Sequence, residues 1–365
     1  MGGGQPGAVR SLRVAPDPAA LAAFRNRLAK NARHWSKWAR RRGYGAYRVY
    51  DRDLPEFPLA IDCYVAEDPA IGTRVHLQEI DTGWQQDESE RDAWREDVRD
   101  ATAEVLALPR EAVVIKHRMR RQGKEQHAKT GARGLDFVVV EAGLRFRVNL
   151  EAYLDTGLFL DHRLLRALVR ERAAGRRMLN LFAYTGSFTV YAAAGGAIAS
   201  DTVDLSNTYL DWAAANFALN GLDPVRHALI RADATAWLDV ARTEGRRYGL
   251  VVLDPPAFSN SKAMTGVLDV QRDHPVLVAA ARRLLAPGGE LFFSTNLRTF
   301  RLEPALAADP AVTDITAQTL PEDFRDRRVH HAFRIAGPAE SPRGSPVSPP
   351  RGGGRSNGPG RPGGR

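Results

Sequence analysis

The sequence contains one cysteine, Cys63, among 365 residues. A single thiol cannot form an intramolecular disulfide or a zinc site with several cysteine ligands. No run of 18 apolar residues is present, which argues against a transmembrane helix. The N-terminus resembles neither a signal peptide nor a myristoylation site. The nine histidines show no metal-ligand spacing. We therefore expect a soluble cytoplasmic protein without a metal ion or a membrane contact.

Two phosphate-binding loops are also missing. The sequence has neither the Gly-x-x-x-x-Gly-Lys-Ser/Thr loop of nucleotide triphosphatases nor the Gly-x-Gly-x-x-Gly loop of dinucleotide-binding folds. The corresponding turn, Tyr184-Thr-Gly-Ser-Phe188, has the single glycine Gly186. A cofactor with ribose and adenine but no phosphate fits this turn better, and S-adenosylmethionine is such a cofactor.

Acidic residues recur where apolar strands end. Asp204, Asp233 and Asp254 each follow a short apolar stretch, at intervals of about 20–30 residues, and helical stretches separate them. In a doubly wound α/β sheet, ligands bind at the carboxyl ends of the strands. Asp204 is placed to bind ribose hydroxyls and Asp233 the adenine amino group. Taken singly, each acid could instead cap a helix or be a surface charge.

We expect strands near residues 178–182, 199–204, 227–231, 249–254 and 289–295, with helices between them. Upstream, the pattern predicts a helix from Asp17-Pro18, strands at 60–65 and 75–80, and an acidic helix from Glu88 to Leu106. A hairpin turning at 141–143 completes a small α+β domain. The domains are therefore predicted as a disordered N-terminus (1–16), a basic α+β subdomain (17–150), a doubly wound α/β domain that would hold the cofactor (151–337) and a disordered tail (338–365).

A stiff loop follows the strand that ends at Asp254. Pro255 and Pro256 fix two φ angles and remove two backbone donors, so carbonyl groups can point into a site. Phe258 could stack on a planar ring. We expect Asp254, Pro255, Pro256 and Phe258 to form the catalytic loop, with Asp254 orienting a group rather than acting as a base.

Four motifs together resemble a known family. They are 153–163 (Tyr-Leu-Asp-Thr-Gly-Leu-Phe-Leu-Asp-His-Arg), 180–187 (Asn-Leu-Phe-Ala-Tyr-Thr-Gly-Ser), 254–262 (Asp-Pro-Pro-Ala-Phe-Ser-Asn-Ser-Lys) and 269–274 (Asp-Val-Gln-Arg-Asp-His). From about Leu21 to Ile335 the chain is similar to the C-terminal, guanine-N7 half of the bifunctional bacterial large-subunit ribosomal RNA methyltransferases K/L.

The resemblance implies an α/β fold, that of a class I methyltransferase with a Rossmann-like seven-stranded sheet. The last two strands of this sheet, near 312–318 and 329–335, are then an antiparallel pair. The resemblance also implies methylation of guanine N7 in 23S ribosomal RNA or a large-subunit precursor. The double enzymes carry an RNA-binding module and a guanine-N2 domain ahead of this half. We expect a separate protein to supply that part, if it is needed.

The predicted cofactor site combines these acids with the loop after the first strand of the sheet. Asp161 and Arg163 carry charges suited to the ammonium and carboxylate of the cofactor, although they could instead pair with each other. The complete predicted set is Asp161, Arg163, Asn180, Phe182, Tyr184, Thr185, Gly186, Ser187, Asp204, Asp233, Ala234 and Asp254.

RNA contact is expected outside the cofactor domain, because residues 151–337 are neutral while the chain carries a net charge of +9. Nine Lys or Arg and no acid occur between Arg25 and Arg48, and a second basic run starts at Lys116. Gln271 and Arg272 could also reach RNA, or belong to an ion-pair network. The predicted RNA-binding residues are Arg25, Lys30, Arg33, Lys37, Arg40, Arg41, Arg42, Arg118, Arg120, Arg121, Lys124 and Arg272.

Three alternatives remain open. Methylation of cytosine C5 normally needs a cysteine thiolate, and Cys63 lies far from the motifs in the sequence. Methylation of guanine N2 uses a similar Asp/Asn-Pro-Pro loop, which this sequence does not exclude. A non-catalytic RNA-binding or ribosome assembly factor is the alternative of another class, and the intact acids at 204, 233 and 254 argue against it.

Overall fold

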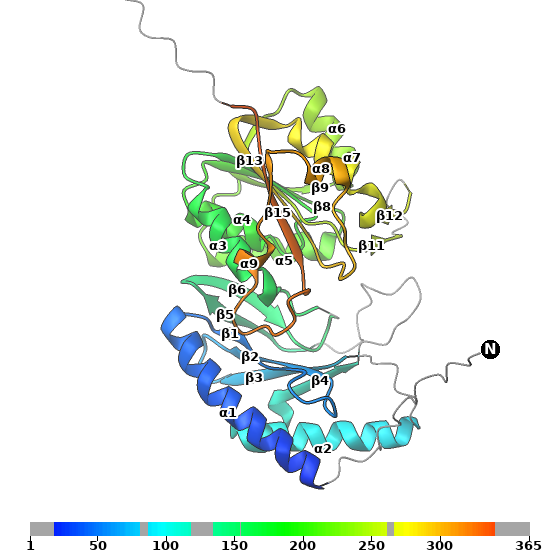
Figure 1. The fold of residues 1–365 in the computed structure, drawn as a ribbon. Helices are drawn as coiled ribbons and strands as arrows, with labels where there is room; N and C mark the ends of the chain where they lie inside the picture. Colours follow the sequence, from blue (N-terminus) through cyan, green and yellow to red (C-terminus); the bar gives the residue numbers. More distant parts are fainter. Residues whose placement is uncertain (1–17, 81–86, 118–133, 154, 261–265, 340–365) are drawn as a thin grey trace, which may run out of the picture.

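The computed structural model describes residues 18–80, 87–117, 134–153, 155–260 and 266–339. Figure 1 shows a smaller N-terminal domain, drawn in blue and cyan, below a larger α/β domain. The predictions for residues 1–16, for Asp17, for the basic residues from Arg118 to Lys124 and for most of the tail lie outside these ranges. Within them, no helix is both long and apolar enough for a membrane span.

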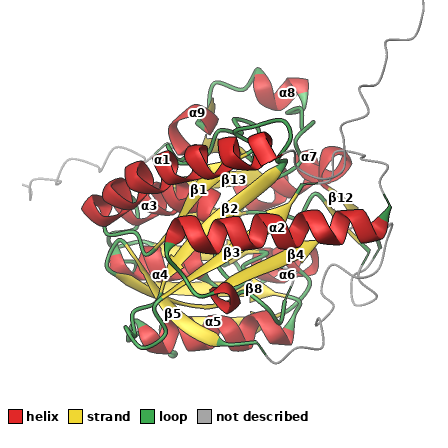
Figure 2. Ribbon diagram, turned by 90° about the horizontal axis from the view of Figure 1, so that it is seen from below, coloured by secondary structure: helices red, strands yellow, loops and turns green. Residues whose placement is uncertain are grey.

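The N-terminal domain packs two helices against one mixed sheet (Figure 2). Antiparallel pairing joins β1 to β2 and β2 to β3, and β4 then pairs parallel to β3. Phe24 and Leu28 of the first helix are fully buried in the core of this domain. The elements are α1 (Pro18–Arg42), β1 (Ala46–Asp51), β2 (Leu59–Val65), β3 (Thr73–Glu79), α2 (Glu88–Leu106) and β4 (Val113–His117).

A hairpin of β5 (Asp136–Glu141) and β6 (Leu144–Asn149) lies between the two domains. Its turn residues, Ala142 and Gly143, have φ angles of 51° and 80°, as a two-residue hairpin turn of this twist requires. The predicted hairpin is therefore confirmed. Backbone bridges join it to the N-terminal domain at Tyr44 and Ala66, while its apolar face packs against helices of the α/β domain.

The α/β domain is built on a seven-stranded sheet in the order β14-β15-β13-β10-β7-β8-β9. Strands β7, β8, β9, β10 and β13 are parallel, and β15 runs antiparallel to both β13 and β14. The predicted strands and their antiparallel end are confirmed, except that the strand expected near 312–318 ends at Asp314, because residues Thr316–Thr319 form a short helix. The bounds are β7 (Arg177–Leu181), β8 (Ala199–Asp204), β9 (His227–Arg231), β10 (Tyr248–Leu253), β13 (Leu285–Thr295), β14 (Val312–Asp314) and β15 (His331–Ala336).

Helices cover both faces of this sheet because its central strands are apolar on both sides. In β10, Leu250 and Val252 face α3 and α4, whereas Val251 and Leu253 face α6 and α7. A short ribbon, β11 (Phe258–Ser259) and β12 (Leu268–Asp269), projects beyond β10. The helices are α3 (Arg163–Glu171), α4 (Ser187–Ala194), α5 (Asn207–Leu219), α6 (Ala234–Thr243), α7 (Val270–Arg282), α8 (Pro304–Ala307) and α9 (Thr316–Thr319).

A buried ion-pair network joins the domains through the hairpin. The Glu141 carboxylate accepts hydrogen bonds from Arg163 Nε at 3.1 Å, from Arg166 Nη2 at 2.6 Å and from the Tyr191 hydroxyl at 2.9 Å. Arg163 also donates to Asp323 at 3.1 Å. Burial alone would raise the pKa of Glu141, but the charges of Arg166 and Arg163 lower it below its usual value. The two guanidinium groups therefore hold this carboxylate ionised inside the protein.

Candidate active site

The loop that follows β7 is held in an unusual backbone conformation. Phe182, Tyr184 and Gly186 have φ angles of 58°, 50° and 71°, which are rarely adopted by residues with side chains. At Gly186 a Cβ atom would also lie 2.8 Å from the Phe217 ring. Such strained backbone persists where surrounding contacts impose it, and it is common at ligand sites.

Asp204, at the end of β8, is one of the groups that fix this loop. Its Oδ2 accepts a hydrogen bond from the Tyr184 backbone N–H at 2.8 Å, and its Oδ1 accepts from the Ser206 N–H at 2.9 Å. These two donors orient a partly exposed carboxylate at the carboxyl edge of the sheet. The structure therefore brings together the β7 loop and the β8 acid, as the sequence predicted.

The predicted catalytic loop begins at the end of β10, next to β7 and β13. The Ser294 hydroxyl donates to Asp254 Oδ1 at 2.6 Å, and His162 Nδ1 lies 3.7 Å from Asp254 Oδ2. Both carboxylate oxygens therefore face side chains from other segments. Phe258 pairs with Asp269 in the β11–β12 ribbon and is 47% exposed, so one part of its ring is open to solvent.

Three residues that the sequence did not assign to the site are Ser294, His162 and His330. His330 Nδ1 is 3.2 Å from Asp161 Oδ2, its Nε2 is 2.9 Å from the Thr319 hydroxyl, and its ring stacks on His162 with centroids 5.1 Å apart. Asp161, His162 and His330 could offer three ligand atoms within 4.8 Å of one another. Since both His330 nitrogens have protein partners, we interpret the cluster as a hydrogen-bonded network.

Asp161 contacts His330 while Arg163 pairs with Glu141 and Asp323, so the alternative ion pair between Asp161 and Arg163 is not formed. Burial would raise the pKa of Asp161, but the charges of His162 and His330 and the hydrogen bond from His330 keep it well below its usual value. His162 lies in the 153–163 motif, so the sequence held a signal for it. His330 lies 169 residues after Asp161 and in none of the four motifs. Only the folded chain reveals this contact.

Two predicted cofactor contacts are corrected by the structure. The Arg163 side chain is 1% exposed and fully engaged with Glu141, Asp323 and the Ala46 carbonyl, so protein groups occupy its donors. The Thr185 side chain is buried and donates to the Gly157 carbonyl at 2.7 Å. Both side chains therefore bind other protein groups and stabilise the site indirectly.

The remaining predicted residues lie at the same sheet edge. Asp233 caps α6 by accepting from the backbone of Thr235 and Ala236, which is the capping role that the sequence left open. Asn180 is buried and donates to Thr189, while its Oδ1 has no partner among the described residues. Ala234 is buried at the start of α6, and Ser187 opens α4.

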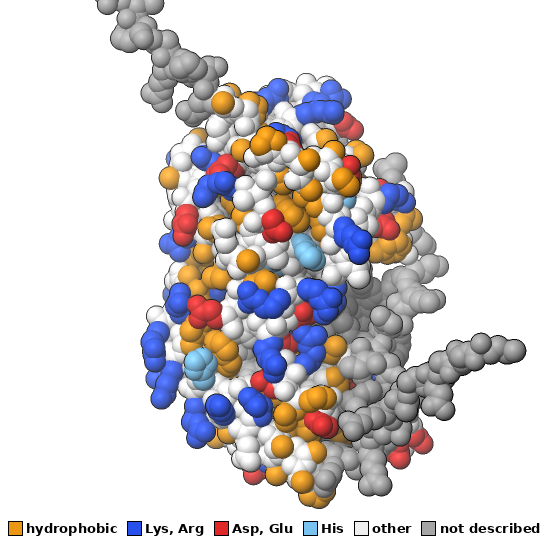
Figure 3. All heavy atoms as spheres, viewed as in Figure 1, with side chains coloured by type: hydrophobic (Ala, Val, Ile, Leu, Met, Phe, Trp, Pro, Cys, Tyr) orange, Lys and Arg blue, Asp and Glu red, His pale blue; other side chains and the backbone are white. Residues whose placement is uncertain are grey.

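Most predicted RNA-binding residues of α1 are exposed. Figure 3 shows Lys and Arg side chains along the lower left edge of the molecule, where Figure 1 draws this helix. Arg25 pairs with Glu104, and Arg42 pairs with Glu322. The remaining ones, which form no ion pair with a described residue, are Lys30, Arg33, Lys37, Arg40 and Arg41.

Arg272 and Lys116 differ from most basic residues of α1, because Arg272 forms an ion pair and Lys116 is buried. Arg272 Nε donates to Asp273 at 2.6 Å, as in the ion-pair alternative that the sequence allowed. Lys116, at the start of the second run, is buried at the end of β4, and this burial lowers its pKa to about 8. Arg118, Arg120, Arg121 and Lys124 lie outside the described residues.

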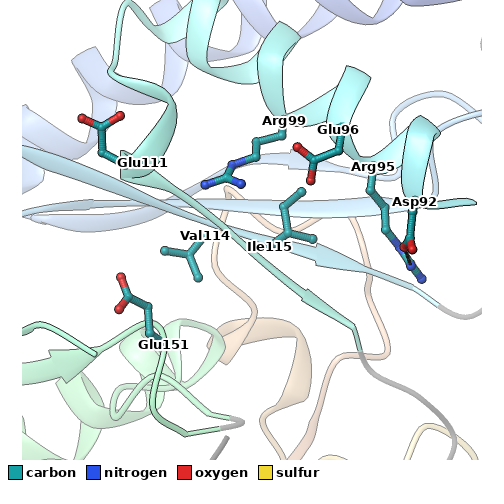
Figure 4. A pocket seen from close by; sticks show the side chains of 8 residues that line it. All are labelled: Asp92, Arg95, Glu96, Arg99, Glu111, Val114, Ile115 and Glu151. Atoms are coloured by element: carbon teal, nitrogen blue, oxygen red, sulfur yellow. Dashed lines mark hydrogen bonds and ion pairs between the residues drawn. The ribbon is translucent and has the colours of Figure 1, made fainter. Parts of the chain in front are cut away.

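A separate hollow lies between α2, β4 and the segment after β6 (Figure 4). Its volume is about 560 Å³. None of the predicted site residues lines it, and acids and arginines alternate around it. Its lining residues are Asp92, Arg95, Glu96, Arg99, Glu111, Val114, Ile115 and Glu151. We therefore assign the candidate active site to the carboxyl edge of the sheet.

Comparisons with known proteins identify the family of this chain. The family model described as S-adenosylmethionine-dependent methyltransferase matches residues 84–347. Ribosomal RNA large subunit methyltransferase K of Neisseria meningitidis is 54% identical over 86% of this chain and 86% of that protein. Methyltransferase K/L of Methylococcus capsulatus is 49% identical over 86% of this chain. This chain spans only 42% of that longer relative.

Solved structures have the same fold. SMU.776 complexed with SAH aligns with a TM-score of 0.66 and 24% identity, over 87% of this chain and 81% of that chain. A SAM-dependent methyltransferase from Agrobacterium tumefaciens aligns with a TM-score of 0.53 and 19% identity, over 76% of this chain and 87% of that chain. At these identities the alignments support the fold alone.

Proposed function

Because this chain belongs to the family of S-adenosylmethionine-dependent methyltransferases, we propose that it methylates N7 of a guanine in the RNA of the large ribosomal subunit or its precursor. The names of its relatives support the RNA substrate. The observation that carries the choice of reaction is an exposed aromatic ring, Phe258, on the loop that starts at Asp254, whose carboxylate the Ser294 hydroxyl holds in place. A ribosomal substrate would also place the protein in the cytoplasm.

The residues at the carboxyl edge fit the family's cofactor. Asp204 presents an oriented carboxylate for the ribose hydroxyls, and it accepts a hydrogen bond from the backbone of the strained 182–187 loop. The unpartnered Oδ1 of Asn180 and Nε2 of His162 are two buried polar atoms in this region. When bound, S-adenosylmethionine supplies an electrophilic methyl group. Asp161 and Asp254 are the acids that would hold its ammonium group.

Replacing Asp204 by alanine is expected to weaken the binding of S-adenosylhomocysteine by about 1.5 kcal/mol, roughly tenfold, because a charge-assisted hydrogen bond to the ribose is lost. Isothermal titration calorimetry with S-adenosylhomocysteine measures this change. Asp211→Ala is the matched control, since Asp211 is an exposed acid on α5. Equal affinities of the two variants would argue against ribose binding by Asp204.

Methylation at guanine N7 makes limited demands on this site. N7 carries an in-plane lone pair and no proton, so the protein must position the base without removing a proton from it. In an RNA helix the N7 edge faces a deep, narrow groove, so the target base has to be unpaired or flipped out. We assign Phe258 to stack on that base and the Pro255–Pro256 carbonyls to accept from its amino edge.

Cys63 argues against methylation at cytosine C5. It lies in β2 of the N-terminal domain, where burial raises the pKa of its thiol to about 12. The C5 reaction needs a thiolate at the target base, and this chain has no second cysteine. Guanine N2 remains the second candidate, because the Asp254-Pro-Pro loop could accept hydrogen bonds from the exocyclic amine.

The proposed reaction is tested by identifying the product. Single-turnover reactions with unmodified large-subunit ribosomal RNA should yield a methylated nucleoside whose strand is cleaved by aniline after borohydride reduction, a behaviour of N7-methylguanosine. Mass spectrometry of the digested RNA identifies the nucleoside independently. A methylguanosine that resists this cleavage would support N2 methylation, and unmodified RNA would support the non-catalytic alternative.

The rate should depend little on pH, because attack by N7 releases no proton in the transition state. We expect a nearly constant single-turnover rate from about pH 7 to about pH 8.5. Circular dichroism at each pH controls for changes in the fold. A tenfold rise in rate per pH unit across this window would indicate that a base or an ionising substrate group takes part, which would contradict the proposal.

A further inference from the structure

The segment from Leu320 to His330, between α9 and β15, contacts both domains and is called here the connecting segment. Figure 1 shows this orange segment along the boundary between the N-terminal domain and the α/β domain. Its contacts place its two ends at two regions discussed above.

The beginning of the connecting segment touches the basic end of α1. The Glu322 carboxylate accepts from Trp38 Nε1 at 2.6 Å and from Arg42 Nη2 at 3.2 Å. Asp323 then accepts from the Arg48 backbone N–H at 2.9 Å and from Arg163. This end is therefore fixed beside the surface that carries the predicted RNA-binding residues of α1.

The other end of the connecting segment reaches the active site. His330 contacts Asp161 at 3.2 Å and stacks on His162. His162 in turn lies 3.7 Å from the Asp254 carboxylate. The connecting segment therefore links the basic end of α1 to the buried cluster of Asp161, His162 and His330 beside Asp254.

The acids and arginines of the connecting segment differ in their partners. Each acid pairs with an arginine of another segment: the exposed Glu322 with Arg42, Asp326 with Arg52 and Arg298, and the buried Asp323 with Arg163. The three arginines, Arg325, Arg327 and Arg328, are exposed. Figure 3 shows Lys and Arg side chains gathered at this level of the molecule, between the two domains.

These three arginines form few ion pairs with the described residues of the protein. Arg325 lies 3.4 Å from Asp53 but its side chain stays 61% exposed. Neither Arg327 nor Arg328 forms an ion pair with a described residue. The backbone beneath them is held, because the N–H groups of Arg325 and Asp326 donate to Asp51 at 2.9 and 3.0 Å. Exposed guanidinium groups on a fixed backbone are suited to bidentate contacts with phosphates.

We infer that Arg325, Arg327 and Arg328 bind phosphates of the RNA strand that leads from α1 to the target guanine. This inference rests on the proposed function. The three arginines add a second set of phosphate contacts, on the active-site side of α1. These contacts fix the position of the RNA strand while the target base is unpaired. Phosphate contacts of this kind set the register of a nucleic acid on a protein and do not read its sequence.

The test measures how binding depends on salt. A labelled single-stranded RNA oligonucleotide with one guanosine is titrated with the full chain at several salt concentrations, and fluorescence anisotropy gives each Kd. The double variant Arg327→Gln/Arg328→Gln should bind more weakly, with a log K against log salt slope that is shallower by roughly 0.7 per lost contact. Arg327→Lys/Arg328→Lys keeps both charges and should restore most of the slope.

The matched control is Arg247→Gln/Arg283→Gln, two exposed arginines at the opposite, amino edge of the sheet. It should bind RNA like the wild type, and S-adenosylhomocysteine affinity should be unchanged in every variant. If the wild type binds and methylates RNA but the Arg327/Arg328 glutamine variant keeps its affinity and slope, the inference is wrong and the proposed function stands. A wild type that neither binds nor methylates RNA would instead refute the proposed function.

Discussion

Replacing Glu141 by alanine is expected to lower the free energy of unfolding by about 3–5 kcal/mol, because it leaves two buried guanidinium groups without their shared carboxylate. Arg163 and Arg166 are 1% and 0% exposed, so water cannot replace the lost partner. Urea denaturation followed by circular dichroism measures the change. A loss below about 1 kcal/mol would contradict this account of the network.

The matched control is Glu104→Ala, which breaks the exposed pair between Arg25 and Glu104 and should cost about 0–1 kcal/mol. If the Glu141→Ala chain does not fold, Glu141→Gln preserves the shape of the side chain and tests the charge alone. The pKa of Glu141 is lowered by folding, so the carboxylate stabilises the protein above its unfolded pKa. This stability is lost as the pH falls through the folded pKa, and the Gln variant should show less of that acid dependence.

Replacing Phe258 by alanine is expected to slow methyl transfer by roughly ten- to a hundredfold, because stacking of a base on an aromatic ring contributes about 1–3 kcal/mol. Single-turnover rates at saturating cofactor measure this effect. S-adenosylhomocysteine binding should change little, since Phe258 is in the projecting ribbon rather than in the β7 or β8 loops.

Two further variants separate stacking from simple loss of apolar surface. Phe258→Trp keeps an aromatic face and should retain most of the rate. Val276→Ala removes an apolar side chain that is 72% exposed on α7, and it should leave the rate unchanged. An unaffected rate in Phe258→Ala would mean that another group holds the target base.

The elements of the α/β domain could be predicted because their signals are local. Apolar strands, the helices between them and the acid at each strand end repeat along the chain, and the sheet edge then brings Asp204 and Asp254 together. The Asp254-Pro-Pro loop could be recognised in the same way. These features depend on residues that are neighbours in sequence.

The roles of Arg163 and His330 could not be predicted in this way. Arg163 looks like a cofactor ligand until Asp323, 160 residues later in the chain, and Glu141 are placed against it. His330 has no motif around it, and its partner Asp161 is set by the docking of β15 into the sheet. Such contacts depend on tertiary packing, and the spacing of residues along the chain does not reveal which distant residues meet.

The order of the strands has a consequence for synthesis of the chain on the ribosome. β15 lies between β13 and β14, so β14, although made earlier, has no neighbour in the sheet until β15 has emerged. Asp323 and His330, which complete the Arg163 network and the active-site cluster, precede β15 directly. Since chains fold as they are synthesised from the N-terminus, the site is completed only after nearly the whole sheet has left the exit tunnel. A nascent chain that stops before Leu320 would have helix α1 in place but would lack Asp323 and His330, so the network around Arg163 and the cluster around Asp161 would both be incomplete.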